Sequence, residues 1–215
     1  MKRMWLDDLG VVGASTWCLT LVRDLWAEEV LELAGAPVVR DGSLADAERV
    51  NMIAVRPVGA AWSLAVEFNG WLGFVGNQDD LLVELSANGA TACSAWSTPN
   101  NEGVVYVPAP DSVVRYHPSR RQLDGPISPA MLARMTDTGI LADADDGTSL
   151  GDRMVTAISV FTGIFLDQEF LVADDWVVGV GHPDRVREAI RRSGPGSRTG
   201  SRWPDAADLR MGEQF

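Results

Sequence analysis

The sequence predicts an α+β protein, built on a mainly antiparallel meander sheet of about six strands with helices packed on one face. Short runs of alternating apolar residues are separated by turn residues, and short turns join antiparallel neighbours. Strand-like runs dominate the first half of the chain and helix-like runs gather in the second, an order typical of α+β proteins. With 215 residues, 46 % of them hydrophobic, the chain can bury one full core.

The first predicted strand covers residues 17–23, WCLTLVR, in which apolar and polar side chains alternate. A helix follows, in which Asp24 is the expected N-cap and Gly35 the stop. Residues 37–49 are polar and are expected to form a loop. Residues 51–56, NMIAVR, then predict a short second strand.

The strongest local signal predicts an antiparallel hairpin over residues 61–75. Apolar residues alternate with small or polar ones along residues 62–68, which is the period of a half-buried strand. Asn69-Gly70 follows at once, and both residues accept the positive φ of a two-residue hairpin turn. Large apolar side chains then return in residues 71–74.

The rest of the chain predicts further short strands and then helices. A helix capped by Asn77 is expected to end at Asn88-Gly89. Three strands follow, at residues 91–97, 104–107 and 113–117. Ser128-Pro129 opens a helix that ends at Gly139, and Thr148 or Ser149 opens the next. The last elements expected are a strand near residues 176–181 and a helix from Pro183 to Arg192.

Residues 1–192 are predicted to form a single domain and residues 193–215 a flexible tail, because the tail is rich in Gly, Pro, Ser and Arg. The net charge of −12 is unevenly distributed. Residues 1–182 carry 11 basic and 25 acidic side chains, whereas residues 183–215 carry 7 and 5. An acidic body repels nucleic acid and attracts a basic protein partner. The simpler alternative is that the charge serves solubility alone.

The sequence predicts a cytoplasmic protein with no membrane partner. The N-terminus lacks the apolar region of a secretory signal, and no run approaches the ~18 apolar residues of a membrane span. Cys18 and Cys93 lie in apolar, strand-like runs and are expected to be reduced, buried thiols.

No motif for catalysis, metal binding or cofactor binding is present. Cys93 and His117 could meet across a sheet, but nothing in the sequence establishes it. The acidic run 143–146 lacks the spacing of a calcium loop, and Gly179-Val180-Gly181 lacks the third glycine and the lysine of a phosphate loop. We therefore predict no catalytic residue, no metal and no cofactor. The groups assigned to binding are Glu67, Trp71, Arg115 and His117.

The eight tryptophans offer a separate signal, because an exposed Trp often anchors a protein interface. Trp5 and Trp203, near the two ends, are the best candidates for exposure.

Four segments together resemble an uncharacterised family of actinobacterial proteins, a domain of unknown function. They are WCLTLVRDLWAEEVLELAG, WSLAVEFNGWLG, DDLLVELSANGATACSAW and SPAMLARM. The resemblance covers roughly residues 15–140 and does not extend to the arginine-bearing C-terminus. It implies an α+β layout and no known activity.

The composition and the lack of a catalytic set favour a non-enzymatic protein that binds another protein. An immunity or antitoxin-like role in bacterial conflict, with a basic toxin as partner, is one concrete form. One alternative is a small-molecule-binding protein or minor enzyme with a pocket between the sheet and the C-terminal helices, in which Glu67, Cys93, Arg115 and His117 are the groups to examine. Another is a structural or assembly component of a phage or prophage.

Overall fold

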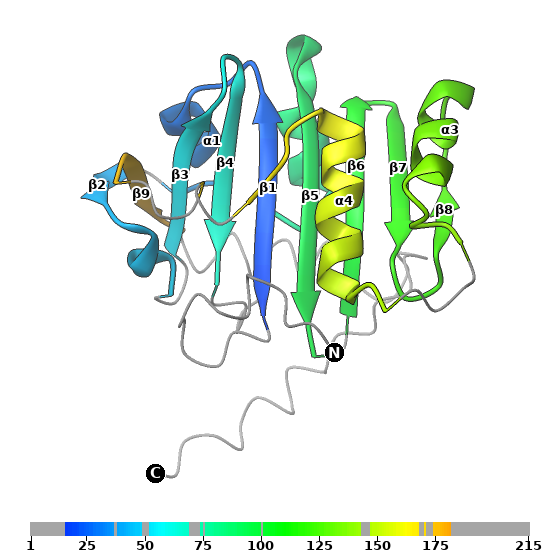
Figure 1. Cartoon of the computed structure of the whole chain (residues 1–215). Coiled ribbons are helices and arrows are strands. Elements are labelled where there is room, and N and C mark those ends of the chain that lie inside the picture. The colour runs from blue at the N-terminus through cyan, green and yellow to red at the C-terminus, as the bar shows by residue number, and fades with distance from the viewer. Residues whose placement is uncertain are drawn as a thin grey trace, which may run out of the picture.

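The computed structural model describes residues 16–36, 38–48, 52–68, 74, 76–99, 101–142, 147–167, 170 and 174–181. Within these residues the chain forms one sheet whose nine strands run in the order β2-β9-β3-β4-β1-β5-β6-β7-β8 (Figure 1). The strands are β1 (Trp17–Arg23), β2 (Val38–Gly42), β3 (Met52–Val58), β4 (Trp62–Glu67), β5 (Thr91–Thr98), β6 (Asn101–Ala109), β7 (Ser112–His117), β8 (Gln122–Asp124) and β9 (Trp176–Val180).

All the strand pairs are antiparallel, which confirms the predicted sheet type. The expected number of about six strands is wrong, since nine are described. The missed strands are β2, in the presumed loop over residues 37–49, and the short β8 at the opposite edge. The sheet is also more than a meander, because β9 inserts between β2 and β3, and β1 lies between β4 and β5.

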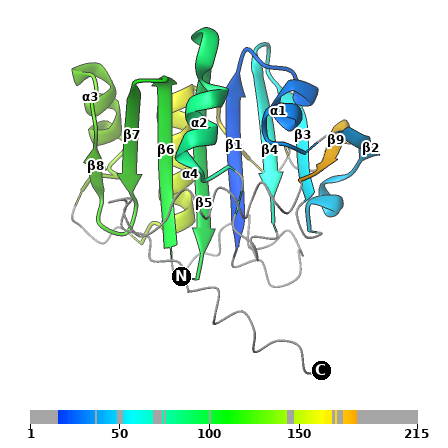
Figure 2. The same cartoon turned by 180° about the vertical axis from the view of Figure 1, so that it is seen from behind.

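Helices cover both faces of the sheet, which corrects the expectation of a single covered face. Helices α1 (Ala27–Leu33) and α2 (Asp79–Leu85) lie on one face (Figure 2), and α4 (Leu150–Thr162) lies on the other, with α3 (Pro129–Asp137) packed against it (Figure 1). The physical reason is visible in β1, where residues 17–22 are all buried. A strand with both faces buried needs a layer on each side.

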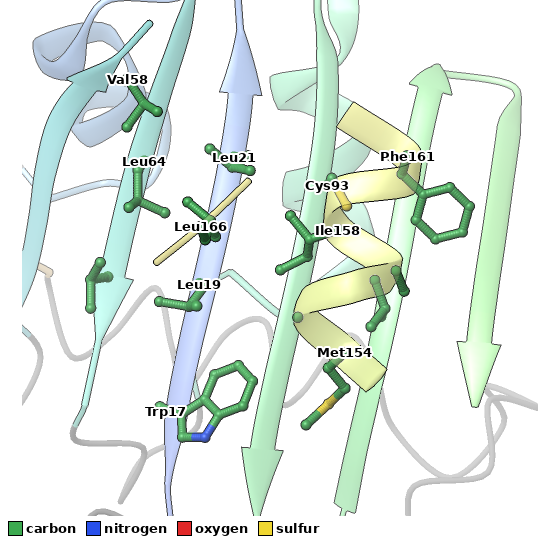
Figure 3. Packing of buried hydrophobic residues seen from close by; sticks show 14 of the residues in the cluster. Trp17, Leu19, Leu21, Val58, Leu64, Cys93, Met154, Ile158, Phe161 and Leu166 are labelled. Atoms are coloured by element: carbon green, nitrogen blue, oxygen red, sulfur yellow. The ribbon is translucent and has the colours of Figure 1, made fainter. Parts of the chain in front are cut away.

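The larger core lies between the sheet and α4 (Figure 3). Leu19 and Leu21 point from β1 towards this side, where Ile158 of α4 packs. The second core lies under α1 and α2, where Val30, Leu31, Leu82 and Leu85 meet the alternate residues of the strands.

The expectation that residues 62–68 form the first strand of a hairpin over residues 61–75 is wrong, because β4 pairs with other strands. Both edges of β4 are occupied, by β3 on one side and β1 on the other, so a returning strand has no edge to pair with. The hairpin that does form joins β3 to β4, and Gly59 in its turn has a φ of 64°. Residues 69–73 lie outside the described residues.

Several helix boundaries match the predicted capping residues. Ser128 accepts a hydrogen bond from the Met131 amide at the start of α3, and Ser149 accepts one from the Asp152 amide at the start of α4. The glycine stop after α1 is also confirmed, since Gly35 has a φ of 68°. The expected caps Asp24 and Asn77 are wrong, because the N-cap of α1 is Trp26, two residues later, and that of α2 is Gln78, one residue later.

The two cysteines are free and buried, as expected. The boundary at residue 192, the tail over 193–215 and the helix expected from Pro183 all lie outside the described residues. Among the helices that the structure describes, none is both long and apolar enough to span a membrane.

Candidate functional site

The structure describes three of the four predicted binding residues and does not bring them to one place. Glu67 lies on β4, whereas Arg115 and His117 lie on β7. Three strands intervene, and four inter-strand steps of about 4.8 Å separate the two groups by about 19 Å. All three side chains alternate onto the sheet face that α1 and α2 cover. Trp71 lies outside the described residues.

Glu67 belongs to a buried polar cluster on three neighbouring strands. Its Oε1 accepts a hydrogen bond from the Gly76 amide at 2.8 Å. Beside it, the hydroxyls of Thr20 and Ser94 lie 3.0 Å apart, and the Ser94 hydroxyl lies 3.3 Å from the Cys18 sulfur. The polar groups of this cluster therefore satisfy one another below the surface.

This cluster is closed by the backbone at Gly76. A Cβ built there would lie 2.1 Å from the Thr20 hydroxyl and 2.9 Å from the Cys18 sulfur, so only glycine fits. Burial, and then the nearby Glu67 charge, raises the pKa of the Cys18 thiol above its ordinary value of 9.0. A thiol held in its protonated form is a poor nucleophile, so we assign the cluster a structural role.

The possible pair between Cys93 and His117 does not form. Cys93 on β5 belongs to the core beneath α4, and burial raises the pKa of its thiol. His117 alternates onto the opposite face of the sheet, two strands away. Its Nε2 lies 3.0 Å from the Asp124 carboxylate on the edge strand β8, which is a pair between two surface side chains.

Arg115 makes an ion pair with Asp79 in the first turn of α2. This contact ties β7 to the helix layer and partly neutralises the acidic start of α2. Arg115 thus acts as a support for α2, and both partners remain partly exposed.

The helices on this face carry charge of one sign. Within their bounds, α1 and α2 hold six carboxylates and no basic residue: Glu28, Glu29, Glu32, Asp79, Asp80 and Glu84. In contrast, α3 and α4 hold two acidic and two basic residues: Arg134, Asp137, Asp152 and Arg153. The two helix layers therefore differ in charge: α1 and α2 carry only acidic charged side chains, whereas α3 and α4 carry no net charge.

Trp26 stands at the edge of this acidic layer with 75 % of its surface exposed. It is the residue before α1, and its extended backbone directs the chain into the helix. Its amide donates a hydrogen bond of 2.7 Å to the Glu29 carboxylate, which fixes the first turn. We call Trp26 and the six carboxylates of α1 and α2 the acidic surface.

Sequence reasoning missed Trp26 because its spacing to Val30 fits the apolar stripe of a helix. The structure places the buried stripe at Ala27, Val30 and Leu31 instead. Since the helix begins one residue after Trp26, the indole lies outside the packed stripe. The two tryptophans expected to be exposed, Trp5 and Trp203, lie outside the described residues.

A cavity of about 400 Å³ lies on the opposite side of the protein, between α3 and α4. Its lining includes Arg134, Asp137, Val155, Leu166 and the strongly exposed Phe165. No strand residue lines it, so it differs in place from the pocket expected between the sheet and the C-terminal helices.

No group of three or more His, Cys, Asp or Glu side chains within the described ranges is arranged to hold a metal ion. No family model, no curated protein and no solved structure matches the chain. The resemblance to the actinobacterial family therefore stays a prediction.

Proposed function

We propose that the protein binds a basic protein partner through the acidic surface. The observation that carries this proposal is the exposure of Trp26 directly beside the carboxylates of α1. Tryptophan is enriched among the residues that dominate binding energy at interfaces, and removing such an anchor commonly weakens binding strongly. An anchor surrounded by charge of one sign fits a partner that offers an apolar pocket with a basic rim.

The carboxylates and the indole have separate roles in this binding. The six carboxylates attract a basic partner over a distance and accelerate the encounter, an effect that salt screens. Once the two proteins touch, burial of the indole slows dissociation, because contact at the centre of an interface acts mainly on the off-rate. The charges thus govern the association rate and Trp26 governs the lifetime of the complex.

An immunity or antitoxin-like role is a concrete form of this function. Such a protein needs fast capture of a basic target and no chemistry of its own. What supports it is the acidic charge of α1 and α2, together with thiols that burial keeps protonated and a polar cluster that is closed off from solvent.

The test begins by isolating the partner from the native host at low salt and then measuring the affinity of the purified pair. We expect Trp26→Ala to weaken binding at least tenfold by lowering the lifetime of the complex. The variant Glu28→Gln/Glu29→Gln/Glu32→Gln is expected to slow association and to flatten its dependence on salt.

Phe165→Ala is the matched control, because it removes an equally exposed aromatic side chain from the neutral face. It should leave the affinity unchanged. If Phe165→Ala weakened binding while Trp26→Ala did not, the acidic surface would be excluded as the binding site.

The cavity beside Phe165 supports a second candidate function, the binding of a small molecule. Its lining is largely apolar, and Arg134 on α3 offers a cation at its rim. That combination suits an amphipathic molecule with an acidic group. The same control variant discriminates the two functions. If the cavity binds a small molecule, Phe165→Ala should lower the affinity for that molecule and leave the affinity for the protein partner unchanged.

A further inference from the structure

We propose that the arginine-rich residues 185–202 of the same chain bind the acidic surface and compete there with the protein partner. This inference rests on the proposed function, because it concerns the same surface. Residues 185–202 contain six arginines and one glutamate, a net charge of +5. The six carboxylates of α1 and α2, of which Asp79 is paired with Arg115, carry charge of the opposite sign.

The described chain ends close to this surface. The last strand, β9, lies between β2 and β3, the part of the sheet that α1 covers (Figure 2). Gly179 is packed so tightly against the end of α1 that a Cβ there would lie 2.1 Å from the carbonyl oxygen of Ala36 and 2.8 Å from Leu31. The described chain therefore ends beside the C-terminal end of α1.

The reach of the segment is ample for the contact. Ten residues span about 33 Å as extended chain and about 15 Å as the helix predicted from Pro183 to Arg192. Helix α1, with seven residues, is only about 10 Å long. Arginines from 185 onwards can thus meet the carboxylates of α1 directly, and those nearer 202 can reach α2.

Tethering makes this contact effective even if each ion pair is weak. A segment that is joined to its binding site through few residues acts at an effective concentration in the millimolar range. Exposed ion pairs contribute little singly, but several of them together hold a segment at low salt. A partner must then displace the segment, which favours a partner that also engages Trp26 over one that offers positive charge alone.

The first experiment measures where the segment lies, using pairs of spin labels on the full-length protein. One label is placed by Ser197→Cys in the segment. The second is placed by Ala87→Cys beside α2 or, as the matched control, by Ala133→Cys on the outer side of α3. The native cysteines are buried and free, so they do not compete for the label.

We expect a short, narrow distance distribution for the pair at positions 87 and 197, and a long, broad one for the pair at 133 and 197. Raising the salt concentration, or introducing Arg185→Gln/Arg187→Gln/Arg191→Gln/Arg192→Gln, should broaden the first distribution and leave the second unchanged. Similar broad distributions for both pairs would overturn the proposal. So would a short distance that arises only between singly labelled molecules in a mixture, since that contact would join two chains.

The second experiment measures competition, with a synthetic peptide of residues 185–202 as the probe. We expect the four-glutamine variant to bind this peptide at least tenfold more tightly than the native chain does, because its surface is no longer occupied. Equal affinities would contradict the proposal. A loss of partner binding in Trp26→Ala, together with equal peptide affinities, would leave the proposed function standing and remove only this inference.

Discussion

Gly179→Ala is expected to lower the free energy of unfolding by about 3 kcal/mol, at the upper end of the usual range for overpacking a core. Gly179 lies in β9, where the added Cβ would sit 2.1 Å from the carbonyl oxygen of Ala36. That oxygen belongs to the backbone and cannot turn aside as a side chain could. Either β9 or the end of α1 must therefore shift, and urea denaturation of the two proteins measures the loss.

Two further variants identify the backbone clash as the cause. Adding Leu31→Ala to the Gly179→Ala protein should restore none of the lost stability, because the carbonyl oxygen of Ala36 remains in place. Gly103→Ala provides the contrast, since the nearest atoms to its Cβ would belong to the Trp96 side chain, 2.7 Å away, and not to the backbone. Gly103→Ala should also lower the free energy of unfolding, and replacing Trp96 by a smaller residue in that variant should recover part of the loss. A Gly179→Ala protein as stable as the native one would show that β9 does not pack on α1 in this way.

The free energy of unfolding is expected to fall by about 1.4 kcal/mol per pH unit for each buried thiol once the pH exceeds about 9. Burial raises the pKa of both Cys18 and Cys93 in the folded protein. Above that pH the unfolded chain releases the thiol protons and the folded chain keeps them. Ionisation therefore favours the unfolded state. The contribution of the protonated, buried thiols to stability is intact at lower pH and is lost as the pH rises.

Chemical denaturation at a series of alkaline pH values measures this slope. Tyr106 and Tyr116, whose pKa values are also raised by burial, should steepen it above pH about 10. Cys93→Ala is the matched variant, because it removes one of the two thiols and should lower the slope by about 1.4 kcal/mol per pH unit. A stability that stays flat between pH about 8 and 10 would contradict the burial of these thiols.

Local features of the fold could be predicted where side chains bond to their own backbone. The Ser128 and Ser149 caps satisfy amides three residues ahead, a pattern that is complete within a few residues of sequence. The strand over residues 17–23 was likewise predicted with its bounds, because a run of alternating residues ended at a turn.

The strand order could not be predicted, because it depends on contacts between segments far apart in the chain. Strand β9 pairs with β2 and β3, more than a hundred residues earlier. An Asn-Gly pair does not by itself specify one kind of turn. Asn88-Gly89 ends the α2 region, as predicted, and the two residues have φ values of 57° and 89°. Both residues accept a positive φ, and several kinds of turn require one.

The acidic charge of the protein could be predicted from its composition, but the distribution of that charge over the surface could not. The acidic composition indicated a basic partner, but it could not show that α1 and α2 share one face while the neutral helices share the other. Glu67 illustrates this limit, since its carboxylate accepts a hydrogen bond from the buried Gly76 amide and the residue is only 7 % exposed. Exposure is a property of the whole fold, and so Trp26 emerged only from the structure.

Hydrogen exchange of the protein with and without its partner tests the proposed surface most directly. We predict that partner binding will slow amide exchange along Ala27–Leu33 and Asp79–Leu85, and that Pro129–Asp137 and Leu150–Thr162 will exchange as in the free protein. Protection confined to the latter two helices would contradict the account and place recognition at the neutral face beside Phe165.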